Sequence, residues 1–261
     1  MPFVKPPFEK KYSRIVSVVP SQTELLASLG LDKEVVGITK FCIHPEEWRS
    51  SRAVIGGTKK LNIEKIRQLN PDIIIANKEE NQKEDIEMLN HEFDIYMSDI
   101  NDLNSALTMI TDVGSLTGRE RSAAGIVEKI RPGFEQLVPV KKKLSVAYLI
   151  WKDPYMVAGA DTFINSMLGA CGFENTFHQT RYPETTLEEL AKIAPELILL
   201  SSEPYPFGEK HIIQLLSVLK KSKIFLVDGE CFSWYGSRLL ISTLYFQNLI
   251  NEIEAHPIVD L

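Results

Sequence analysis

The amino-acid sequence predicts an α/β protein with two lobes, each with a parallel-type sheet flanked by helices, bridged by one long α-helix. Apolar runs of strand length alternate with segments of helical periodicity, which is typical of α/β units. The passage NIEKIRQLNPDIIIA at residues 62–76 returns as TLEELAKIAPELILL at residues 186–200, with a long amphipathic pattern between them. We therefore expect an N-terminal α/β lobe over residues 1–116, a linking backbone helix over 117–138 and a C-terminal α/β lobe over 139–261.

The first lobe is expected to alternate strands and helices. Its strands are predicted at residues 14–19, 34–39, 72–76 and 93–98, and its helices at residues 20–29, 62–69, 83–89 and 102–113. Continuous apolar runs of this kind are typical of parallel strands that are buried on both faces. Residues 40–60 are expected to be irregular, and a loop of this length inside a compact domain is usually functional.

The linking helix is predicted from residues 117–137. Thr117 and Glu120 match a capping box, in which two side chains satisfy the first free N–H groups of a helix. Apolar residues follow at three- and four-residue spacing, which predicts one buried face. Such a helix spans about 30 Å, and Pro132 should bend it near its end because proline removes one backbone hydrogen bond.

The second lobe is expected to repeat the plan of the first. Its strands are predicted at residues 144–150, 196–200 and 223–227, and its helices at residues 162–168, 186–193, 211–219 and 237–253. An alternative is a single α/β domain, because any passage of helix, proline and strand looks somewhat alike.

Composition excludes several classes of function. The chain has 261 residues and a net charge of -6, which argues against a nucleic-acid surface. No apolar stretch approaches the ~18–20 residues of a membrane span, and three widely spaced cysteines do not indicate a disulfide framework. We expect a monomer without membrane insertion. The first residues lack the pattern of a signal peptide, so we expect a cytoplasmic protein if the chain is complete, and a periplasmic or cell-surface protein if a leader has been removed.

Aromatic and polar side chains gather after the predicted strands of both lobes. In open α/β sheets, ligands bind beyond the carboxyl ends of the strands, and rings in loops are less well explained by core packing. We expect a cleft between the lobes that holds a small-molecule ligand, large and planar or a metal chelate. The candidate ligand-binding residues are Phe41, Cys42, His44, Lys59, Glu79, Trp151, Tyr155, Arg181, Tyr182, Glu203, Tyr205, Phe232, Trp234 and Arg238.

A few residues in predicted loops suggest two alternative functions. Cys42 and His44 lie two positions apart and provide a soft and a borderline ligand, so one alternative is direct binding of a transition-metal ion. The other is a cytosolic small-molecule hydrolase with Glu203 or Glu230 as its base. No HExxH, CxxC, G-x-S-x-G, Walker A or G-x-G-x-x-G motif is present. We therefore expect a protein that is not an enzyme and holds no covalent cofactor.

Three stretches of the sequence together resemble a known family. They are RIVSVVPSQTELLASLGLDKEVVGIT at residues 14–39, VAGADTFINSMLGACGFENTF at residues 157–177, and the repeated passage described above. These stretches resemble the helical-backbone class of substrate-binding proteins of ABC importers, the vitamin B12 and iron-siderophore binding family. The resemblance covers residues 14–253. It implies two lobes bridged by one long helix, a corrinoid, haem or siderophore held between them, and docking to an ABC permease.

The resemblance also implies roles for individual residues. Glu64 and Glu188 occupy equivalent places in the repeated passage and match the acidic residues with which the family engages permease arginines. A carboxylate in the first turn of a helix is also favoured by the helix dipole, so this pattern has a purely structural explanation as well.

The ligand-contacting positions of the family match less completely. Tyr155 matches an aromatic residue of the B12 binders and Arg181 matches an arginine beside their cleft. Two tryptophans of those proteins fall on Thr58 and near Cys231, which weakens the prediction of vitamin B12 itself. The residues expected to compensate are Phe232, Trp234 and Arg238.

Overall fold

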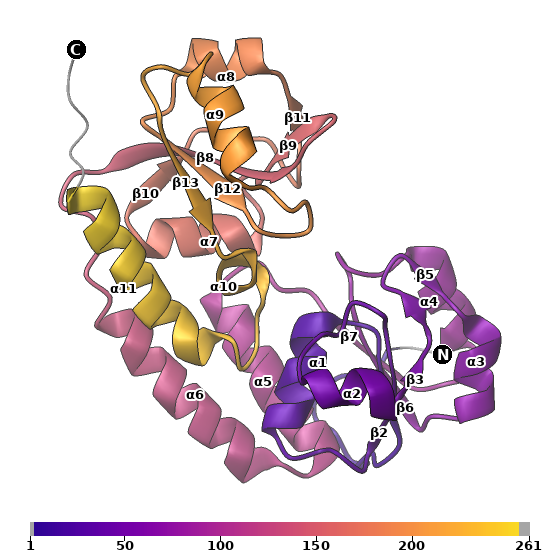
Figure 1. Ribbon diagram of the computed structural model, residues 1–261. Helices are drawn as coiled ribbons and strands as arrows, with labels where there is room; N and C mark the ends of the chain where they lie inside the picture. Colours follow the sequence, from indigo (N-terminus) through magenta and orange to yellow (C-terminus); the bar gives the residue numbers. More distant parts are fainter. Residues whose placement is uncertain (1–2, 256–261) are drawn as a thin grey trace. The chain divides into compact units, whose positions relative to one another are not determined.

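The computed structural model describes residues 3–255, and its internal contacts divide the chain into two compact units (Figure 1). Unit 1 holds the chain up to Ile100, together with Asn104–Arg131 and Tyr235–Arg238. Unit 2 holds Asn101–Leu103, Pro132–Trp234 and the chain from Leu239 onward. Each unit has its own sheet and helices, which confirms the predicted α/β class.

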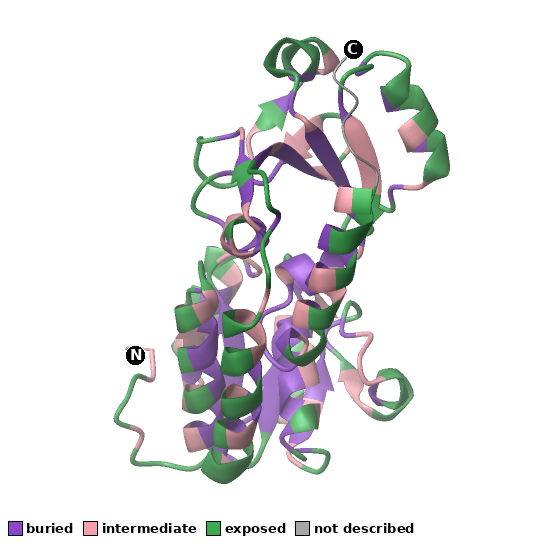
Figure 2. Ribbon diagram, turned by 90° about the vertical axis from the view of Figure 1, so that its left-hand side faces the viewer, coloured by how far each residue is buried: buried purple, intermediate pink, exposed green. Residues whose placement is uncertain are grey.

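Unit 1 contains a five-stranded sheet whose neighbouring strands are all parallel. The strand order is β3-β2-β1-β6-β7, with β1 at Ile15–Ser17, β2 at Val35–Ile38, β3 at Ala53–Val54, β6 at Ile73–Asn77 and β7 at Ile95–Ser98. Its helices are α1 (Pro20–Ser28), α2 (Glu46–Ser51), α3 (Ile63–Leu69), α4 (Lys83–Asn90), α5 (Leu103–Thr117) and most of α6 (Glu120–Glu135). The central strands are buried (Figure 2), as their continuous apolar runs predict.

The stretch expected to be irregular at residues 40–60 contains regular structure. It holds α2, β3 and a small hairpin in which β4 (Gly56–Gly57) pairs antiparallel with β5 (Lys60–Leu61). Two-residue strands are too short to show periodicity, so no pattern in the sequence predicts them. Gly56 is required because its φ is 102° and a Cβ there would lie 2.5 Å from the carbonyl oxygen of Lys60.

The linking helix begins later than predicted. Thr117 is the last residue of α5, where its hydroxyl donates to the Val113 carbonyl at 2.7 Å. Gly118 then has a φ of 69° and ends that helix, and α6 begins at Glu120. The predicted capping box at Thr117 is therefore wrong, whereas Pro132 lies inside α6 as expected. The lobe boundaries inferred from the sequence stay predictions.

Unit 2 contains a six-stranded sheet that is only partly parallel. Its strands are β8 (Leu144–Trp151), β9 (Tyr155–Val157), β10 (Phe173–Asn175), β11 (Glu184–Thr185), β12 (Leu197–Ser201) and β13 (Lys223–Val227). Strands β8, β12, β13 and β10 pair parallel, whereas β9 is antiparallel to β8 and β11. The sequence predicted β8, β12 and β13 but not the three shorter strands. The helices are α7 (Phe163–Ala170), α8 (Leu187–Ile193), α9 (Glu209–Leu216), α10 (Gly229–Ser233) and α11 (Leu239–Ala255).

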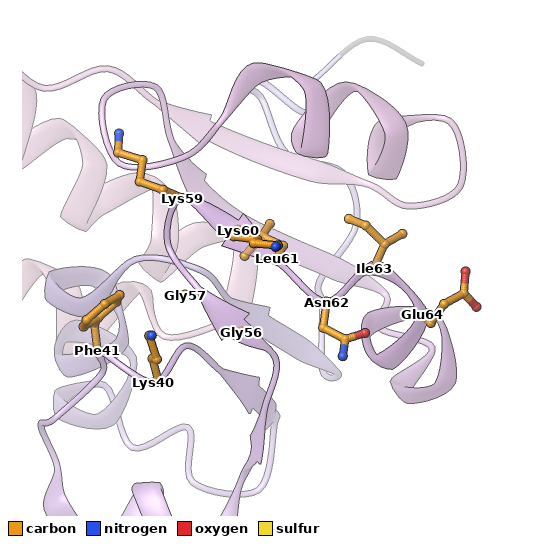
Figure 3. A pocket seen from close by; sticks show the side chains of 10 residues that line it. All are labelled: Lys40, Phe41, Gly56, Gly57, Lys59, Lys60, Leu61, Asn62, Ile63 and Glu64. Carbon is orange, nitrogen blue, oxygen red and sulfur yellow. The ribbon is translucent and has the colours of Figure 1, made fainter.

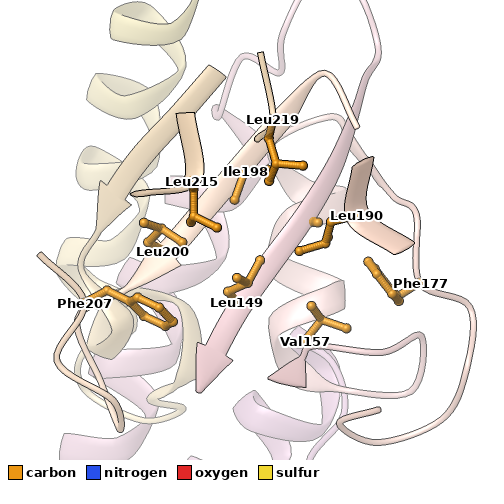
Figure 4. Packing of buried hydrophobic residues seen from close by; sticks show 10 residues of the cluster. Leu149, Val157, Phe177, Leu190, Ile198, Leu200, Phe207, Leu215 and Leu219 are labelled. Carbon is orange, nitrogen blue, oxygen red and sulfur yellow. The ribbon is translucent and has the colours of Figure 1, made fainter. Parts of the chain in front are cut away.

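One face of the unit 2 sheet packs against α8 and α9. Leu149 of β8 and Leu200 of β12 meet Leu215 of α9 and Leu190 of α8 in one buried cluster (Figure 4). Tyr155 and Tyr205 are partly buried and pack against the same cluster. The rings that follow the strands are thus anchored to the core of unit 2.

The repeated passage forms the same structure in both units. In each copy a side chain caps the helix: Asn62 accepts from the Lys65 N–H in unit 1, and Thr186 accepts from the Glu189 N–H in unit 2. Each helix ends at a residue in the left-handed conformation, Asn70 or Ala194. A proline, an acidic residue and a fully buried strand follow each time, as the sequence predicted.

The acidic residue after the proline ties the first strand of each sheet. In unit 1 the two oxygens of Asp72 accept from the backbone N–H groups of Ser13 and Arg14, both at 2.9 Å. In unit 2 Glu196 accepts from the Ser145 N–H at 2.9 Å, and the Ser145 hydroxyl accepts from the Glu196 N–H at 3.0 Å. Both carboxylates act at the amino end of their sheet, because they lie just before β6 and β12.

We expect Glu196→Ala to lower the free energy of unfolding at pH 7 by about 1–2 kcal/mol, since charge-assisted hydrogen bonds at a partly exposed site are lost. The Ser145 N–H bond is the main cause that lowers the pKa of Glu196. This stability is therefore present above the ordinary pKa of 4.5 and is lost as the pH falls through the lower folded value. Urea unfolding followed by circular dichroism at pH 7 and pH 3 measures both effects.

The matched control is Glu174→Ala, which removes an exposed ion pair with Lys143 and should cost less than about 1 kcal/mol. Equal losses in the two variants, or a Glu196→Ala loss that persists unchanged at pH 3, would contradict the role of the carboxylate.

Candidate functional site

A cavity of about 680 Å³ lies in unit 1 at the carboxyl end of its sheet (Figure 3). One wall follows β2 directly, and the other is the β4–β5 hairpin with the start of α3. This volume falls in the range of small-molecule sites. The lining residues are Lys40, Phe41, Gly56, Gly57, Lys59, Lys60, Leu61, Asn62, Ile63 and Glu64.

Phe41 is the most conspicuous apolar group of the cavity. Its side chain is 50% exposed, and the Lys40 ammonium lies 5.0 Å from the centroid of its ring. Gly57 faces this ring, because a Cβ at that position would lie 3.1 Å from a ring carbon. The cavity therefore presents an aromatic face and a positive charge side by side.

The buried side chain of Asn81 holds together the loops beside this cavity. Asn81 donates to the carbonyls of Val18 and Thr58, at 3.0 and 3.2 Å, and accepts from the Asn77 N–H at 2.9 Å. The hairpin is fixed from the other side, where Asp85 accepts from the Leu61 N–H at 2.9 Å. Because each contact uses a backbone group, the shape of the site is set largely by the main chain.

Of the predicted unit 1 ligand residues, Phe41 and Lys59 line the cavity. The Lys59 ammonium donates to the carbonyl of Glu79. Glu79 is therefore adjacent to the cavity through this contact. Phe41 and Glu79 follow β2 and β6 on the carboxyl side of the sheet, as the sequence predicted.

Cys42 lies in the core of unit 1 and His44 is half-buried. The Cys42 thiol is fully buried and lies 3.1 and 3.2 Å from the hydroxyls of Thr23 and Thr39. Burial raises the pKa of Cys42, which works against the thiolate that a metal requires. Within residues 3–255 no three His, Cys, Asp or Glu side chains are grouped so as to hold a metal ion. These observations argue against direct metal binding at Cys42 and His44.

Unit 2 brings several predicted rings together after β8 and β12. Trp151 is 39% exposed and meets Tyr205 edge to face at 5.6 Å between ring centroids. Tyr205 also packs against Phe207 at 4.7 Å. Tyr155, on β9, shares the underlying core cluster with Tyr205. These rings form a second aromatic surface at the carboxyl end of a sheet.

His211 holds this surface in place. Its Nδ1 accepts from the Gly208 N–H at 2.9 Å, so in the neutral ring Nε2 carries the proton and donates to the Tyr205 hydroxyl at 3.2 Å. Burial, followed by the charges of Lys210 and Lys152, lowers the pKa of His211. A neutral imidazole therefore fixes the loop at pH 7, a role that the sequence did not predict.

Phe232 and Trp234 lie deeper than expected. The sequence placed them in a loop, but Phe232 belongs to α10, is 0% exposed and packs 4.7 Å from Phe246. Trp234 is 6% exposed and its indole donates to Glu203 at 2.7 Å. The expectation of loop aromatics is wrong for Phe232, because the short helix α10 turns its ring into the core.

Glu203 serves to tie two loops together. Its Oε1 accepts from the Ser233 hydroxyl at 2.9 Å as well as from the indole of Trp234. These contacts give Oε1 a structural role. They do not test the hydrolase hypothesis, which named Glu230 as an alternative base.

The predicted arginines also have partners. Arg238 forms a two-point ion pair with Glu24 of α1, at 2.7 and 3.2 Å, within unit 1. The backbone N–H of Arg181 donates to Asp161, and Arg181 is exposed while Tyr182 is half-buried. Arg238 is therefore engaged in an internal contact, whereas Arg181 and Tyr182 lie on the connection before β11.

Seven lining residues of the cavity were not among the predicted site residues: Lys40, Gly56, Gly57, Lys60, Leu61, Asn62 and Ile63. The sequence did offer a signal for two of them, because Lys40 follows a strand directly and Lys60 follows the pair Gly56–Gly57. A lysine in a loop is usually just solvated, so this signal was not enough by itself.

Comparison with known proteins identifies the family. A sequence profile described as periplasmic binding protein matches residues 15–221. The chain belongs to the periplasmic binding protein family. This confirms the family expected from the sequence, and members of the family are substrate-binding transport proteins. Within residues 3–255, none of the helices combines the length and the apolar character that crossing a membrane requires.

Two curated proteins are similar in sequence to this periplasmic binding protein. The ABC transporter substrate-binding lipoprotein YvrC of Bacillus subtilis is 25% identical over 247 residues, covering 89% of this chain and 78% of the relative. A vitamin B12-binding protein of Vibrio vulnificus is also 25% identical, over 243 residues, covering 88% of this chain and 86% of the relative.

Solved structures share the fold of this periplasmic binding protein. The haem-binding protein of Roseiflexus sp. RS-1 superposes with a TM-score of 0.77 and 19% identity, covering 92% of this chain and 99% of its own. The vitamin B12-binding protein of Vibrio cholerae gives a TM-score of 0.75 and 18% identity, covering 94% of this chain and 99% of its own.

Proposed function

We propose that this protein is the solute-binding component of an ABC-type importer and captures a metal chelate of the corrinoid, haem or iron-siderophore class. The single observation that carries the proposal is the 680 Å³ cavity at the carboxyl end of the unit 1 sheet, in a chain of the periplasmic binding protein family. The names of the relatives, which refer to vitamin B12, haem and ABC transport, support this class of ligand.

The local chemistry supports binding without turnover. The exposed ring of Phe41 offers a flat surface for a large ligand. The contacts of Glu203 with Ser233 and Trp234 give its Oε1 a structural role. We therefore propose a receptor that is not an enzyme and that takes the chelate as its ligand rather than as a cofactor.

We also propose that the protein works outside the cytoplasmic membrane. Relatives described as a lipoprotein and as periplasmic proteins support this compartment.

Glu64 and Glu188 are the residues that we propose for docking to the permease. Each stands two positions after the N-cap of its helix, Asn62 or Thr186, in the two copies of the repeated passage. Both are exposed, and Glu64 pairs with Arg67. The backbone N–H of Glu188 and the Thr186 hydroxyl lower the pKa of Glu188, which keeps it charged. One exposed carboxylate at the same place on each unit suits a permease with two equivalent basic sites.

Titration with cyanocobalamin, haemin and ferric siderophores, followed by tryptophan fluorescence, tests the proposed ligand class. We expect at least one chelate to quench saturably, and we expect Phe41→Ala to weaken its binding roughly five- to tenfold through lost ring contact. Met88→Ala is the control, because Met88 is 48% exposed on unit 1 but does not line the cavity. Absence of saturable binding by every chelate would refute the proposal.

The double variant Glu64→Gln/Glu188→Gln tests docking. Uptake of the identified chelate should fall severalfold or more in cells that produce this variant, because two charged contacts with the permease are lost. Since Glu64 also lines the cavity, the chelate affinity of the purified variant is measured alongside, and the loss of uptake should exceed any loss of affinity. Glu128→Gln/Glu135→Gln removes the same charge from α6, one residue from each unit, and should transport normally. Equal uptake by the two double variants would rule out the docking role.

A further inference from the structure

The cavity of unit 1 is basic, although the whole chain carries a net charge of -6. Lys40 comes from the loop after β2, and Lys59 and Lys60 come from the β4–β5 hairpin (Figure 3). Positive charge at one hollow of an acidic protein concentrates anions there, because the cavity walls focus the local field.

The three lysines differ in how far their charge is already compensated. Lys59 donates to the Glu79 carbonyl, and its charge also acts on the half-buried carboxyl of Glu80. Within residues 3–255, neither Lys40 nor Lys60 forms an ion pair. The uncompensated charge of the cavity therefore belongs to Lys40 and Lys60.

The acidic lining residue does not cancel this charge. Glu64 lies at the α3 end of the cavity, and its carboxylate pairs with Arg67. Arg67 in turn is held by Glu92 at 2.9 Å. The carboxylate of Glu64 is thus part of a surface ion-pair network on α3 rather than a partner of the cavity lysines.

The walls beside the lysines are apolar. Phe41 exposes half of its surface and Ile63 is half-buried, whereas Leu61 is only 7% exposed. The Lys40 ammonium lies 5.0 Å from the centroid of the Phe41 ring, so one ligand can contact both the ring and the positive charge. An inorganic anion would use the lysines but not this apolar surface.

Resting on the proposed function, we propose that the cavity selects an anionic chelate: a ring-bearing metal complex with carboxylate groups, whose ring packs on Phe41 while Lys40 and Lys60 pair with the carboxylates. The site therefore favours negatively charged chelates over uncharged ones of similar size. Lys59 positions the hairpin through the Glu79 carbonyl and contributes less to the ligand.

Matched ligands test this selection. The probes are haemin, which has two carboxylates, its dimethyl ester, which has none, ferric citrate, and the uncharged chelates ferrichrome and cyanocobalamin, each measured by calorimetry. We expect the tightest ligand to be anionic and Lys40→Gln/Lys60→Gln to weaken it about tenfold or more, as charge-assisted bonds are lost. Lys40→Arg/Lys60→Arg should keep most of the affinity, and higher salt should reduce it.

Lys33→Gln/Lys129→Gln is the matched control, because both lysines are exposed on unit 1, outside the cavity, and the same charge is removed. Tight binding of an uncharged chelate, or equal affinity in the cavity variant and this control, would overturn the selection while leaving the receptor function intact. If none of the five chelates binds, the proposed function fails and the selection fails with it.

Discussion

The structure depends on one repeated interaction, the carboxylate that follows a proline and ties the first strand of each sheet. Asp72 binds the backbone of Ser13 and Arg14 in unit 1, and Glu196 binds that of Ser145 in unit 2. Strands that are buried on both faces consist mainly of apolar side chains, so a charge-assisted contact at the strand end adds a directional constraint on their register. The preceding proline and left-handed residue stop the helix and aim the carboxylate at that contact.

This arrangement separates stability from binding within each unit. The carboxylate contacts act at the amino ends of the strands, whereas the cavity and the exposed rings lie at the carboxyl ends. Loops at the carboxyl ends can therefore vary their side chains without loss of the sheet. In unit 1 those loops carry Phe41, Lys40 and Lys60, and the main-chain contacts of Asn81 keep them in shape. An acidic protein can in this way hold a basic, ring-lined cavity.

Much of the fold was predictable, but less of the site. Apolar runs and the repeated passage predicted the long strands, because a strand that is buried on both faces has a continuous run of apolar residues. The β4–β5 hairpin was missed, since two-residue strands have no period, and Thr117 resembled a cap although it ends α5. Aromatic residues in predicted loops identified the proposed ligand surface only in part. Phe41 is exposed, but Phe232 lies in a five-residue helix that turns its ring into the core. The two-residue spacing of Cys42 and His44 also did not predict that the hydroxyls of Thr23 and Thr39 contact the Cys42 thiol.

Hydrogen–deuterium exchange with and without saturating haemin tests the central claim most directly, namely that the ligand occupies the carboxyl-end loops of unit 1. The account predicts slower exchange in residues 39–42 and 56–62, which border the cavity, and unchanged exchange in residues 70–74, at the amino end of the same sheet. Slowing confined to residues 70–74, or unchanged exchange around the cavity in the haemin-bound protein, would contradict it.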